Sequence, residues 1–490
     1  MAKRNESAPH NLQISTEDNK ERFPQKINMT GRPNIIIFLA DDLGYHDLSC
    51  YGNRDHHTPN LDALAAGGMR FTDCHSNGSV CSPTRAALLT GRYQQRSGIE
   101  HVLGPDPAKS PGMAADEPTF AHLFRDAGYA TGMFGKYHTG HIPHQSPNKM
   151  GFDVFRGMNG GMDHHSRFNR WGSGVWYHDE TLVEYDPGYS TELICDHAIS
   201  FMEHHAGQPF LLYIADWMVH FPWQGPNDPP DFAKGVDNSA PEKKYGSVKD
   251  RKRAYREMVE ALDGSVGRVM ESVRKLGIEE NTLFIFTSDN GGHHLICDNL
   301  PLRGHKGDLF EGGHRVPAIA CWPGQIEAGS ICDETIMLFD LMPTMLELTG
   351  IEPPADRHLD GTSLLPVLRG EGGLPERTIF WRMGSKWAVR QGCWKAVCHG
   401  DEPPQLYELS EDIGETRDLA HAYPQRVQEM IAAFEQWERD VDRDSLDNSR
   451  ANFAADKNSH KKHPTSQSLR RGRQKKKKKG AGELLIVNRK

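Results

Sequence analysis

Residues Asn34–Ala40 read NIIIFLA, and this continuous apolar run ends abruptly in Asp41-Asp42. An unbroken run of this kind is typical of a strand buried on both faces, as in parallel sheets flanked by helices. A second such run, Thr282–Thr287, is followed at once by Ser288-Asp289-Asn290. The two runs predict a buried sheet whose strand ends carry polar side chains.

Helical and strand-like segments alternate around these two runs. Predicted helices lie near Pro59–Ala66, Pro83–Thr90, Thr119–Ala127, Glu192–His205 and Lys249–Leu276, and further predicted strands lie at 129–134 and Phe210–Ala215. Alternation over about 300 residues predicts an α/β fold with a doubly wound sheet flanked by helices.

The pattern changes after about Pro366. Four short strand-like pieces (TIFWRM, WAVRQ, WKAVC and QLYELS) precede a predicted closing helix near Tyr423–Arg439. They predict a small antiparallel sheet with one helix packed on it. We therefore expect four regions: a disordered N-terminal extension (1–31), a main domain (32–365), a small C-terminal α+β subdomain (366–440) and a disordered basic tail (441–490).

Charge and hydropathy narrow the class of protein. The chain of 490 residues has 57 basic and 66 acidic side chains, a net charge of −9, which argues against a nucleic-acid-binding body. The basic run Arg470–Lys479 is interpreted as a solvated tail, with attachment to an anionic surface, polymer or partner as the alternative.

No apolar run is long enough to span a membrane, and the first thirty residues contain no signal-peptide core. A cytoplasmic location is expected, with export left open.

The nine cysteines are sparse, odd in number and free of any CxxC pattern. This distribution argues against a disulfide scaffold and against a zinc–thiolate site.

The polar residues at the two strand ends are candidate metal ligands. Ligands of open α/β sheets collect at the carboxyl ends of strands, so Asp41, Asp42, Asp289 and Asn290 are expected to meet there. Three carboxylates would repel one another without a cation, and oxygen ligands favour Ca²⁺ or Mg²⁺ over zinc. The alternative is that both pairs are ordinary turn residues.

Residues 79–91 read SVCSPTRAALLTG and predict a helix with Pro83 in its first turn and Ser82 as its N-cap. Cys81 would then lie at a helix N-terminus, where amide groups and the helix dipole favour an anion, and Arg85 would follow one turn later. Such a site suits a reactive thiol, and a small buried cysteine is the alternative.

The segment Cys81–Arg85, CSPTR, with Leu88–Gly91, resembles the C-x-P-x-R signature of the sulfatase family. Asn34–Gly52 resembles the family's opening strand and first metal-ligand pair, and Gly128–Gly140 (GYATGMFGKYHTG) is similar to its second signature. SDNGG and LRGHKGDLFEGGHRVP are also typical of it. The resemblance spans about residues 32–438, with mild departures at His46, Phe134 and Tyr137.

The resemblance implies a fold, an activity and a set of cofactors. The fold would be alkaline-phosphatase-like, residues 32–365 would be the catalytic domain, and the enzyme would be a sulfuric ester hydrolase. Cys81 would be oxidised to formylglycine by a formylglycine-generating enzyme. Ca²⁺, with Mg²⁺ less favoured, would be held by Asp41, Asp42, Asp289, Asn290 and residue 81.

The resemblance also implies catalytic roles. Arg85, Lys136 and Lys306 would hold the sulfate oxygens, a form of fixed electrostatic stabilisation. His220, in WMVHFPWQ, would be the general acid together with Lys306, although its context departs from the family's and a packing role is the alternative. His138 would remove a proton from the formylglycine diol to release sulfate.

The expected substrate is a sulfated small molecule or glycan. An alternative is a phosphonate monoester or phosphodiester hydrolase of the same superfamily, and another is a silent binding protein that keeps Cys81 as a thiol. His293, His294, His305 and Asp163–Ser166 are further polar residues without an assigned role. Oligomeric state stays open.

Overall fold

The computed structural model describes residues 31–449, except 105–110, 115, 142 and 185. Nearly all of the predicted N-terminal extension and the basic run Arg470–Lys479 therefore lie outside the described residues. The features below all belong to the compact unit Arg32–Lys490.

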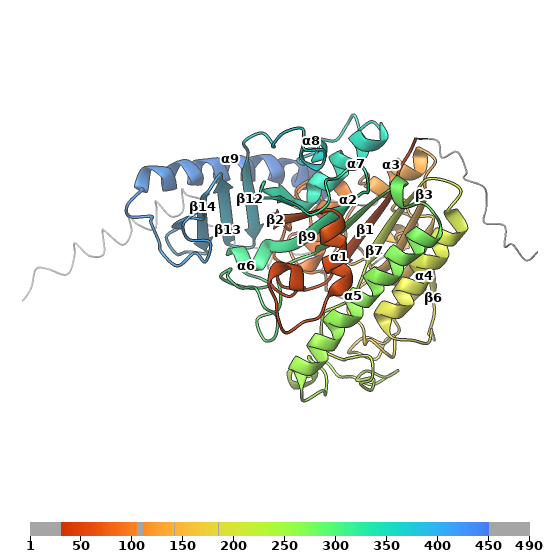
Figure 1. Cartoon of the computed structure of the whole chain (residues 1–490). Helices are drawn as coiled ribbons and strands as arrows, with labels where there is room; N and C mark the ends of the chain where they lie inside the picture. Colours follow the sequence, from red (N-terminus) through yellow and green to blue (C-terminus); the bar gives the residue numbers. More distant parts are fainter. Residues whose placement is uncertain (1–30, 105–110, 115, 142, 185, 450–490) are drawn as a thin grey trace, which may run out of the picture. The chain divides into compact units, whose positions relative to one another are not determined.

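A large mixed sheet forms the centre of this unit (Figure 1). Among the described residues its strands follow the order β10-β2-β9-β8-β1-β7-β3-β4-β5-β6, with β11 paired to β2. The neighbours β8, β1, β7, β3 and β4 are parallel, whereas β9, β5 and β6 run antiparallel to the strands beside them. The bounds are β1 (Asn34–Ala40), β2 (Met69–His75), β3 (Ala130–Lys136), β4 (Val154–Met158), β5 (Trp176–His178), β6 (Thr181–Leu182), β7 (Phe210–Ala215), β8 (Thr282–Ser288), β9 (Arg315–Cys321), β10 (Ser330–Cys332) and β11 (Ile336–Met337).

Helices cover both faces of the sheet, as a doubly wound arrangement requires (Figure 1). One face carries α1 (Pro59–Gly67), α4 (Ser190–His205) and α5 (Arg251–Lys275), and the other carries α2 (Cys81–Thr90), α3 (Phe120–Asp126) and α7 (Leu341–Thr349). Ile35, Ile37 and Leu39 of β1 share a buried apolar cluster with α2, α3 and α7. All seven residues of β1 are buried, which explains why Ile35–Ala40 is a continuous apolar run rather than an alternating one. The one polar residue, Asn34, donates a hydrogen bond from Nδ2 to Thr282 Oγ1 at 3.3 Å.

The register places the ends of the central strands at one edge. Ala40 of β1 pairs with Ser288 of β8, Leu39 pairs with Ala215 of β7, and Ala215 also pairs with Gly135 of β3. The loops that follow these four strands therefore leave the sheet side by side. This edge carries the residues of the candidate site.

The predicted element types are confirmed, with one correction at α2. The helix begins at Cys81 with Val80 as its N-cap, so the prediction of Ser82 as the N-cap is wrong. Ser82 is buried in the first turn, and its Oγ accepts a hydrogen bond from the Leu103 N–H at 3.1 Å. The contact between these two segments takes up the hydroxyl that would otherwise cap the helix.

A four-stranded antiparallel sheet and a long helix form the C-terminal part. The elements are β12 (Thr378–Met383), β13 (Lys386–Gln391), β14 (Trp394–His399), β15 (Gln405–Glu408) and α9 (Pro424–Ser449). Helix α9 extends beyond the boundary expected at residue 440. Val441 is fully buried and Asp442 accepts a 2.7 Å hydrogen bond from Arg382, so tertiary contacts hold the first residues of this extension.

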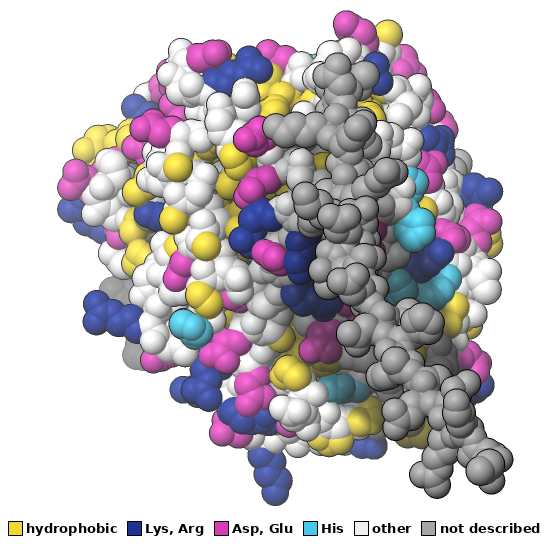
Figure 2. Space-filling model, turned by 45° about the vertical axis from the view of Figure 1, so that its right-hand side comes forward, with side chains coloured by type: hydrophobic (Ala, Val, Ile, Leu, Met, Phe, Trp, Pro, Cys, Tyr) yellow, Lys and Arg dark blue, Asp and Glu magenta, His cyan; other side chains and the backbone are white. Residues whose placement is uncertain are grey.

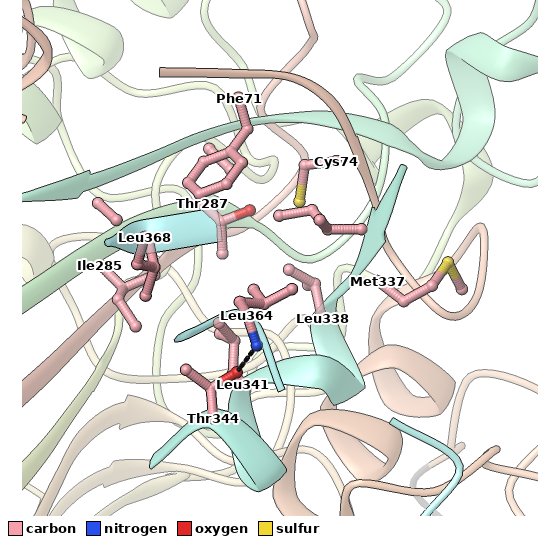
Figure 3. A pocket seen from close by; sticks show the side chains of 13 residues that line it. Phe71, Cys74, Ile285, Thr287, Met337, Leu338, Leu341, Thr344, Leu364 and Leu368 are labelled. Carbon is pink, nitrogen blue, oxygen red and sulfur yellow. Dashed lines mark hydrogen bonds between the residues drawn. The ribbon is translucent and has the colours of Figure 1, made fainter. Parts of the chain in front are cut away.

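A small apolar cavity of about 20 Å³ lies in the core between β2, β8, β9 and α7 (Figure 3). Phe71, Ile285, Leu338 and Leu364 are among the side chains around it. The hydroxyl of Thr344 accepts a hydrogen bond from the Leu364 N–H at 2.8 Å, the dashed line in Figure 3. Its lining is almost wholly apolar, so it offers too few polar groups to hold a water molecule. We therefore interpret it as a gap in the packing of the core.

The surface seen in Figure 2 carries basic and acidic side chains interspersed with one another. On the described part of this face they form no continuous basic region. Within residues 31–449, and leaving aside the gaps named above, no helix is long and apolar enough to cross a membrane.

Candidate active site

Four strand ends supply most of the predicted site residues. Asp41 and Asp42 follow β1, and Asp289 and Asn290 follow β8. Lys136 is the last residue of β3 and His138 comes two residues later, while His220 lies in the loop after β7. Cys81 and Arg85 come from the first turns of α2, and Lys306 from the loop between β8 and β9.

The two acidic strand ends are in direct contact. The Asp42 N–H donates to Asp289 Oδ1 at 3.2 Å, and Asn290 Nδ2 donates to Asp42 Oδ1 at 2.8 Å. Asp41, Asp42, Asp289 and Asn290 are all buried, with at most 1% of their surface exposed. The four residues that the sequence predicted to meet therefore lie together in the structure.

Three cations neutralise this buried negative charge. Arg85 donates to Asp289 Oδ2 from Nε and Nη2 at 3.0 and 2.8 Å, and its Nη2 also lies 2.8 Å from Asp41 Oδ2. Lys136 Nζ donates to Asp41 Oδ2 at 2.6 Å, and Lys306 Nζ donates to Asp42 Oδ1 at 2.5 Å. Each buried carboxylate thus has a charged donor, without which its burial would be very unfavourable.

Cys81 lies beside this ionic cluster. Its Sγ is 3.5 Å from Lys306 Nζ, and its side chain is 1% exposed. One ligand atom from each of Cys81, Asp41, Asp42 and His220 lies within 4.8 Å of the others. The start of α2, the end of β1 and the loop after β7 therefore converge at the sulfur.

Three buried oxygens of the cluster indicate room for a cation. Within the described residues, Asp41 Oδ1, Asp42 Oδ2 and Asn290 Oδ1 have no hydrogen-bond partner. A buried acceptor without a partner is costly, and a bound cation would satisfy all three. The donor set of oxygens fits a hard divalent ion. Both Asp289 oxygens, by contrast, already accept hydrogen bonds from Asp42 and Arg85.

The titration of the carboxylates reflects their burial and their neighbours. Burial opposes ionisation of Asp41, but Lys136 and Arg85 outweigh it and hold the Asp41 pKa well below its ordinary value. Burial and the adjacent Asp41 charge raise the pKa of Asp289 to about 6. Burial also raises the pKa of the Cys81 thiol. A thiolate is therefore disfavoured here, which argues against the simple reactive-thiol interpretation.

The two histidines occupy different parts of the site. His138 is buried, and its Nε2 lies 3.1 Å from the Leu103 carbonyl, while no described residue bonds its Nδ1. Burial and the charges of Lys136 and Arg85 lower the His138 pKa well below its ordinary value, so the ring is a neutral proton acceptor. His220 Nε2 lies 3.7 Å from Asp42 Oδ2 and its Nδ1 lies 2.7 Å from the Phe221 carbonyl.

Trp217 is a site residue that the sequence reasoning missed. Its ring stacks on His220 at a centroid distance of 4.2 Å, and Lys136 Nζ lies 4.6 Å from the ring centre. It therefore orients two predicted site residues at once. The available signal was its position two residues after strand Phe210–Ala215, the same kind of strand end that identified Asp41.

The Asp163–Ser166 segment orders the surrounding loops. Asp163 accepts hydrogen bonds from the Gln224 side chain at 3.1 Å and from the Asp231 N–H at 2.7 Å. His164 Nε2 lies 2.9 Å from the His220 carbonyl. These contacts fix the loop that carries His220.

An aromatic and basic cluster adjoins His220. The rings of Trp223 and Tyr245 are stacked 5.2 Å apart, and both contact His293. Phe221 contacts His220 at 4.1 Å, Lys244 lies over Phe221 and Tyr245, and Arg251 lies over Trp223 and Tyr245.

Comparison with known proteins places this geometry in a family context. The family described as Sulfatase matches residues 33–351, and the family described as N-sulphoglucosamine sulphohydrolase, C-terminal, matches residues 305–434. Arylsulfatase A of Bos taurus is 34% identical over 479 residues, covering 83% of this chain and 87% of that protein. N-acetylgalactosamine-6-sulfatase of Canis lupus familiaris is 36% identical over 390 residues, covering 74% and 71%.

Solved structures support the same fold. The crystal structure of Ps i-CgsB in complex with k-i-k-neocarrahexaose superposes with a TM-score of 0.74 at 30% identity, covering 86% of this chain and 98% of that one. The phosphonate monoester hydrolase of Agrobacterium radiobacter superposes with a TM-score of 0.61 at 21% identity, covering 85% and 96%. The expected alkaline-phosphatase-like α/β fold is confirmed.

Proposed function

We propose that this chain, which belongs to the sulfatase family and is a hydrolase of sulfuric esters, cleaves sulfate monoesters of saccharides at the site around Cys81. The observation that carries the proposal is the convergence of Cys81 with Asp41, Asp42 and Lys306 at one edge of the sheet. A sulfate ester is anionic and releases an alkoxide, so its hydrolysis requires fixed positive charge and a proton donor. Both are present beside residue 81.

The proposed cofactors fit the chemistry of the donor groups. Asp41, Asp42 and Asn290 would hold Ca²⁺ through their unpaired oxygens, with Asp289 and residue 81 completing the site. The cation would supply charge neutralisation, and formylglycine formed from Cys81 would supply the nucleophilic hydroxyl. The raised pKa of the unmodified thiol supports a modified nucleophile, since an unmodified Cys81 would be largely protonated.

Positive charge is the proposed contribution of Arg85, Lys136 and Lys306. Arg85 and Lys136 hold Asp41 ionised, and Lys136 is kept in place by the Trp217 ring. Burial opposes the charge on Lys306, but the carboxylates of Asp42 and Asp41 raise the Lys306 pKa above its ordinary value. Lys306 would therefore stay protonated beside the reacting group.

Proton transfer is assigned to three residues. Burial and the charge of Lys306 lower the His220 pKa well below its ordinary value, so His220 would be neutral. Lys306, which stays protonated, would be the charged donor to the leaving oxygen. His220 would donate a hydrogen bond to the same oxygen. His138 is neutral and its Nδ1 is unpaired among the described residues. It would take the proton that leaves residue 81 when sulfate is released.

The saccharide part of the proposal rests on the aromatic cluster and on the relatives. Phe221 lies against His220, and Tyr245 contacts Phe221; both rings are partly exposed, while Trp223 is buried behind Tyr245. Lys244 lies over Phe221 and Tyr245 and adds positive charge there. Such a surface suits a sugar that carries an anionic group. One similar protein is named N-acetylgalactosamine-6-sulfatase and a similar structure is titled as a complex with k-i-k-neocarrahexaose, which favours a saccharide.

The test compares purified protein, with position 81 checked by peptide mass spectrometry, on sulfated saccharides, 4-nitrophenyl sulfate and a phosphonate monoester. We expect residue 81 to have the mass of formylglycine and the sulfated saccharide to be the best substrate. A dominant phosphonate rate would favour the phosphonate hydrolase alternative. A binding protein would show an unmodified thiol and no turnover, and Cys81→Ala is the inactive reference.

A further inference from the structure

Outside the candidate active site, three metal-ligating side chains meet at an edge of the main sheet. His178 is the last residue of β5, Asp186 follows β6, and His197 lies in the middle of α4. One donor atom of each residue lies within 4.8 Å of the other two. Only the packing of the β5–β6 hairpin beside α4 brings the three together.

Both imidazole rings point at the same carboxylate. His178 Nε2 lies 2.8 Å from Asp186 Oδ2, and His197 Nε2 lies 3.2 Å from the same oxygen. Donor atoms of a tetrahedral zinc ion bound at about 2.0–2.1 Å lie roughly 3.3 Å from one another. The two nitrogen–oxygen distances are therefore close to those of a zinc site, and small side-chain shifts would admit the ion.

Neighbouring aromatic residues fix the three side chains. The His197 ring stacks on Phe134 and Trp176 at centroid distances of 6.5 and 6.4 Å. Trp176 Nε1 donates to Asp186 Oδ2 at 3.0 Å, a contact of the kind that orients ligating carboxylates. The side chains of His178, Asp186 and His197 are 33%, 15% and 24% exposed, so a water molecule can reach a fourth ligand position.

We propose that His178, Asp186 and His197 bind a zinc ion, with water as the fourth ligand. Two imidazoles and one carboxylate favour zinc over Ca²⁺ or Mg²⁺. The ion would link the β5–β6 hairpin to α4 at the sheet edge, a structural role separate from ester hydrolysis.

A second cluster of ligating side chains serves as a contrast. His75, Glu311 and His314 also lie close together, but they are fully buried. Lys395 Nζ already donates to Glu311 at 2.8 Å and lies 3.0 Å from His314 Nε2. A buried ammonium group in contact with two of the three ligands repels a cation, so this cluster carries no proposal.

The test titrates zinc into the full-length protein, after removal of metals by a chelator and addition of Ca²⁺, by isothermal calorimetry. His197→Ala and Asp186→Asn are compared with wild type and with His204→Ala, a histidine exposed on the same helix. We expect wild type and the His204→Ala control to bind one more zinc ion than the two variants, or to bind it more than roughly tenfold more tightly, because even outer neighbours of a metal site contribute 10–100-fold.

Substitution by Co²⁺ provides a second readout. Wild type and the control should give the visible bands of tetrahedral cobalt, and both ligand variants should lose them. Asp186→Asn keeps the side-chain shape, so it remains informative if His197→Ala fails to fold. Equal zinc affinity and stoichiometry in all four proteins, or no zinc binding by wild type, would overturn the proposal.

Discussion

Arg85 is a single residue on which the ionic balance of the site depends. Its guanidinium is fully buried and bonds both Asp41 and Asp289, which belong to different strand ends. Removing one member of a buried ion pair leaves an uncompensated charge. A substitution here should therefore affect folding as well as catalysis.

We expect Arg85→Met to lower the free energy of unfolding by about 3–5 kcal/mol, because Asp289 would lose both of its charged hydrogen bonds. Urea denaturation followed by circular dichroism measures this. The control is Arg274→Met, whose ion pair with Glu271 is half-exposed and should contribute less than about 1 kcal/mol. Equal stabilities of the two variants would contradict the interpretation.

Lys306 is the residue whose charge is expected to matter most directly for turnover. Lys306→Met should reduce kcat by about 10²–10³-fold, the usual effect of losing one fixed donor to a developing negative charge. Steady-state kinetics on 4-nitrophenyl sulfate measures it. Lys386→Met, at a neighbouring side chain that donates to the Gly307 carbonyl, is the control and should retain nearly full activity. A kcat within twofold of wild type for Lys306→Met would exclude this role.

At the scale of elements, a buried charge network joins the C-terminal sheet to α6 (Glu311–His314). Lys395 of β14 donates to Glu311 at 2.8 Å and lies 2.9 Å from Glu415, and all three side chains are fully buried. Glu415 also accepts a 2.7 Å hydrogen bond from the Glu311 N–H. The network positions α6, and β9 begins directly after α6, at Arg315.

This network predicts a pH dependence of stability. Burial raises the pKa of Glu415 from 4.5 to about 7. Between these two values the folded protein keeps a proton that the unfolded chain has released, so stability should fall as the pH rises from about 4.5 to about 7. We expect Glu415→Gln to reduce that fall, measured by urea unfolding at several pH values. The exposed Glu429→Gln should leave it unchanged, and an unaltered slope in Glu415→Gln would refute the prediction.

The core cavity makes a prediction about packing. Leu364 is 1% exposed and lines the cavity, so Leu364→Ala would enlarge a void that is already present (Figure 3). We expect it to lower the free energy of unfolding by about 2–5 kcal/mol. Thermal and urea unfolding measure the loss. Leu295→Ala, at a side chain that is 47% exposed, is the control and should change stability by less than about 0.5 kcal/mol.

At the scale of the whole molecule, cation binding should stabilise the fold. Ca²⁺ at 100 times its Kd would add about 2.7 kcal/mol, because it binds the folded site and has no matching site in the unfolded chain. We expect Tm to rise with added Ca²⁺ and to fall with a chelator. Asp42→Asn should lose most of this response, since Asp42 Oδ2 is one of the unpaired oxygens. A Tm that ignores Ca²⁺ in wild type would argue against the cation site.

The sequence alone indicated most of the sheet and the identity of the site residues. The runs Asn34–Ala40 and Phe210–Ala215 predicted strands with the observed bounds, because a strand buried on both faces is apolar at nearly every position. The pairs Asp41-Asp42 and Asp289-Asn290 predicted the acidic cluster, because polar residues directly after buried parallel strands lie at the same edge of the sheet. Cys81 was identified through the C-x-P-x-R motif. The preference of a helix start for anions gave only part of the reason to single it out.

Other features depended on contacts between distant segments. Ser82 is not the N-cap of α2, because the Leu103 N–H takes its hydroxyl, and α9 passes residue 440, because Arg382 binds Asp442. Trp217 became a site residue only when β7 was paired between β1 and β3.

The sequence by itself determined where strands end, which residues there can carry charge, and which cysteine lies at a helix start, since these follow from local burial and backbone geometry. The tertiary structure decided which charges compensate one another and which oxygens stay unpaired. Those properties depend on distances between residues far apart in the chain, such as Arg85 and Asp289, which are 204 positions apart. Strand order and register set these distances, and local sequence patterns do not encode them.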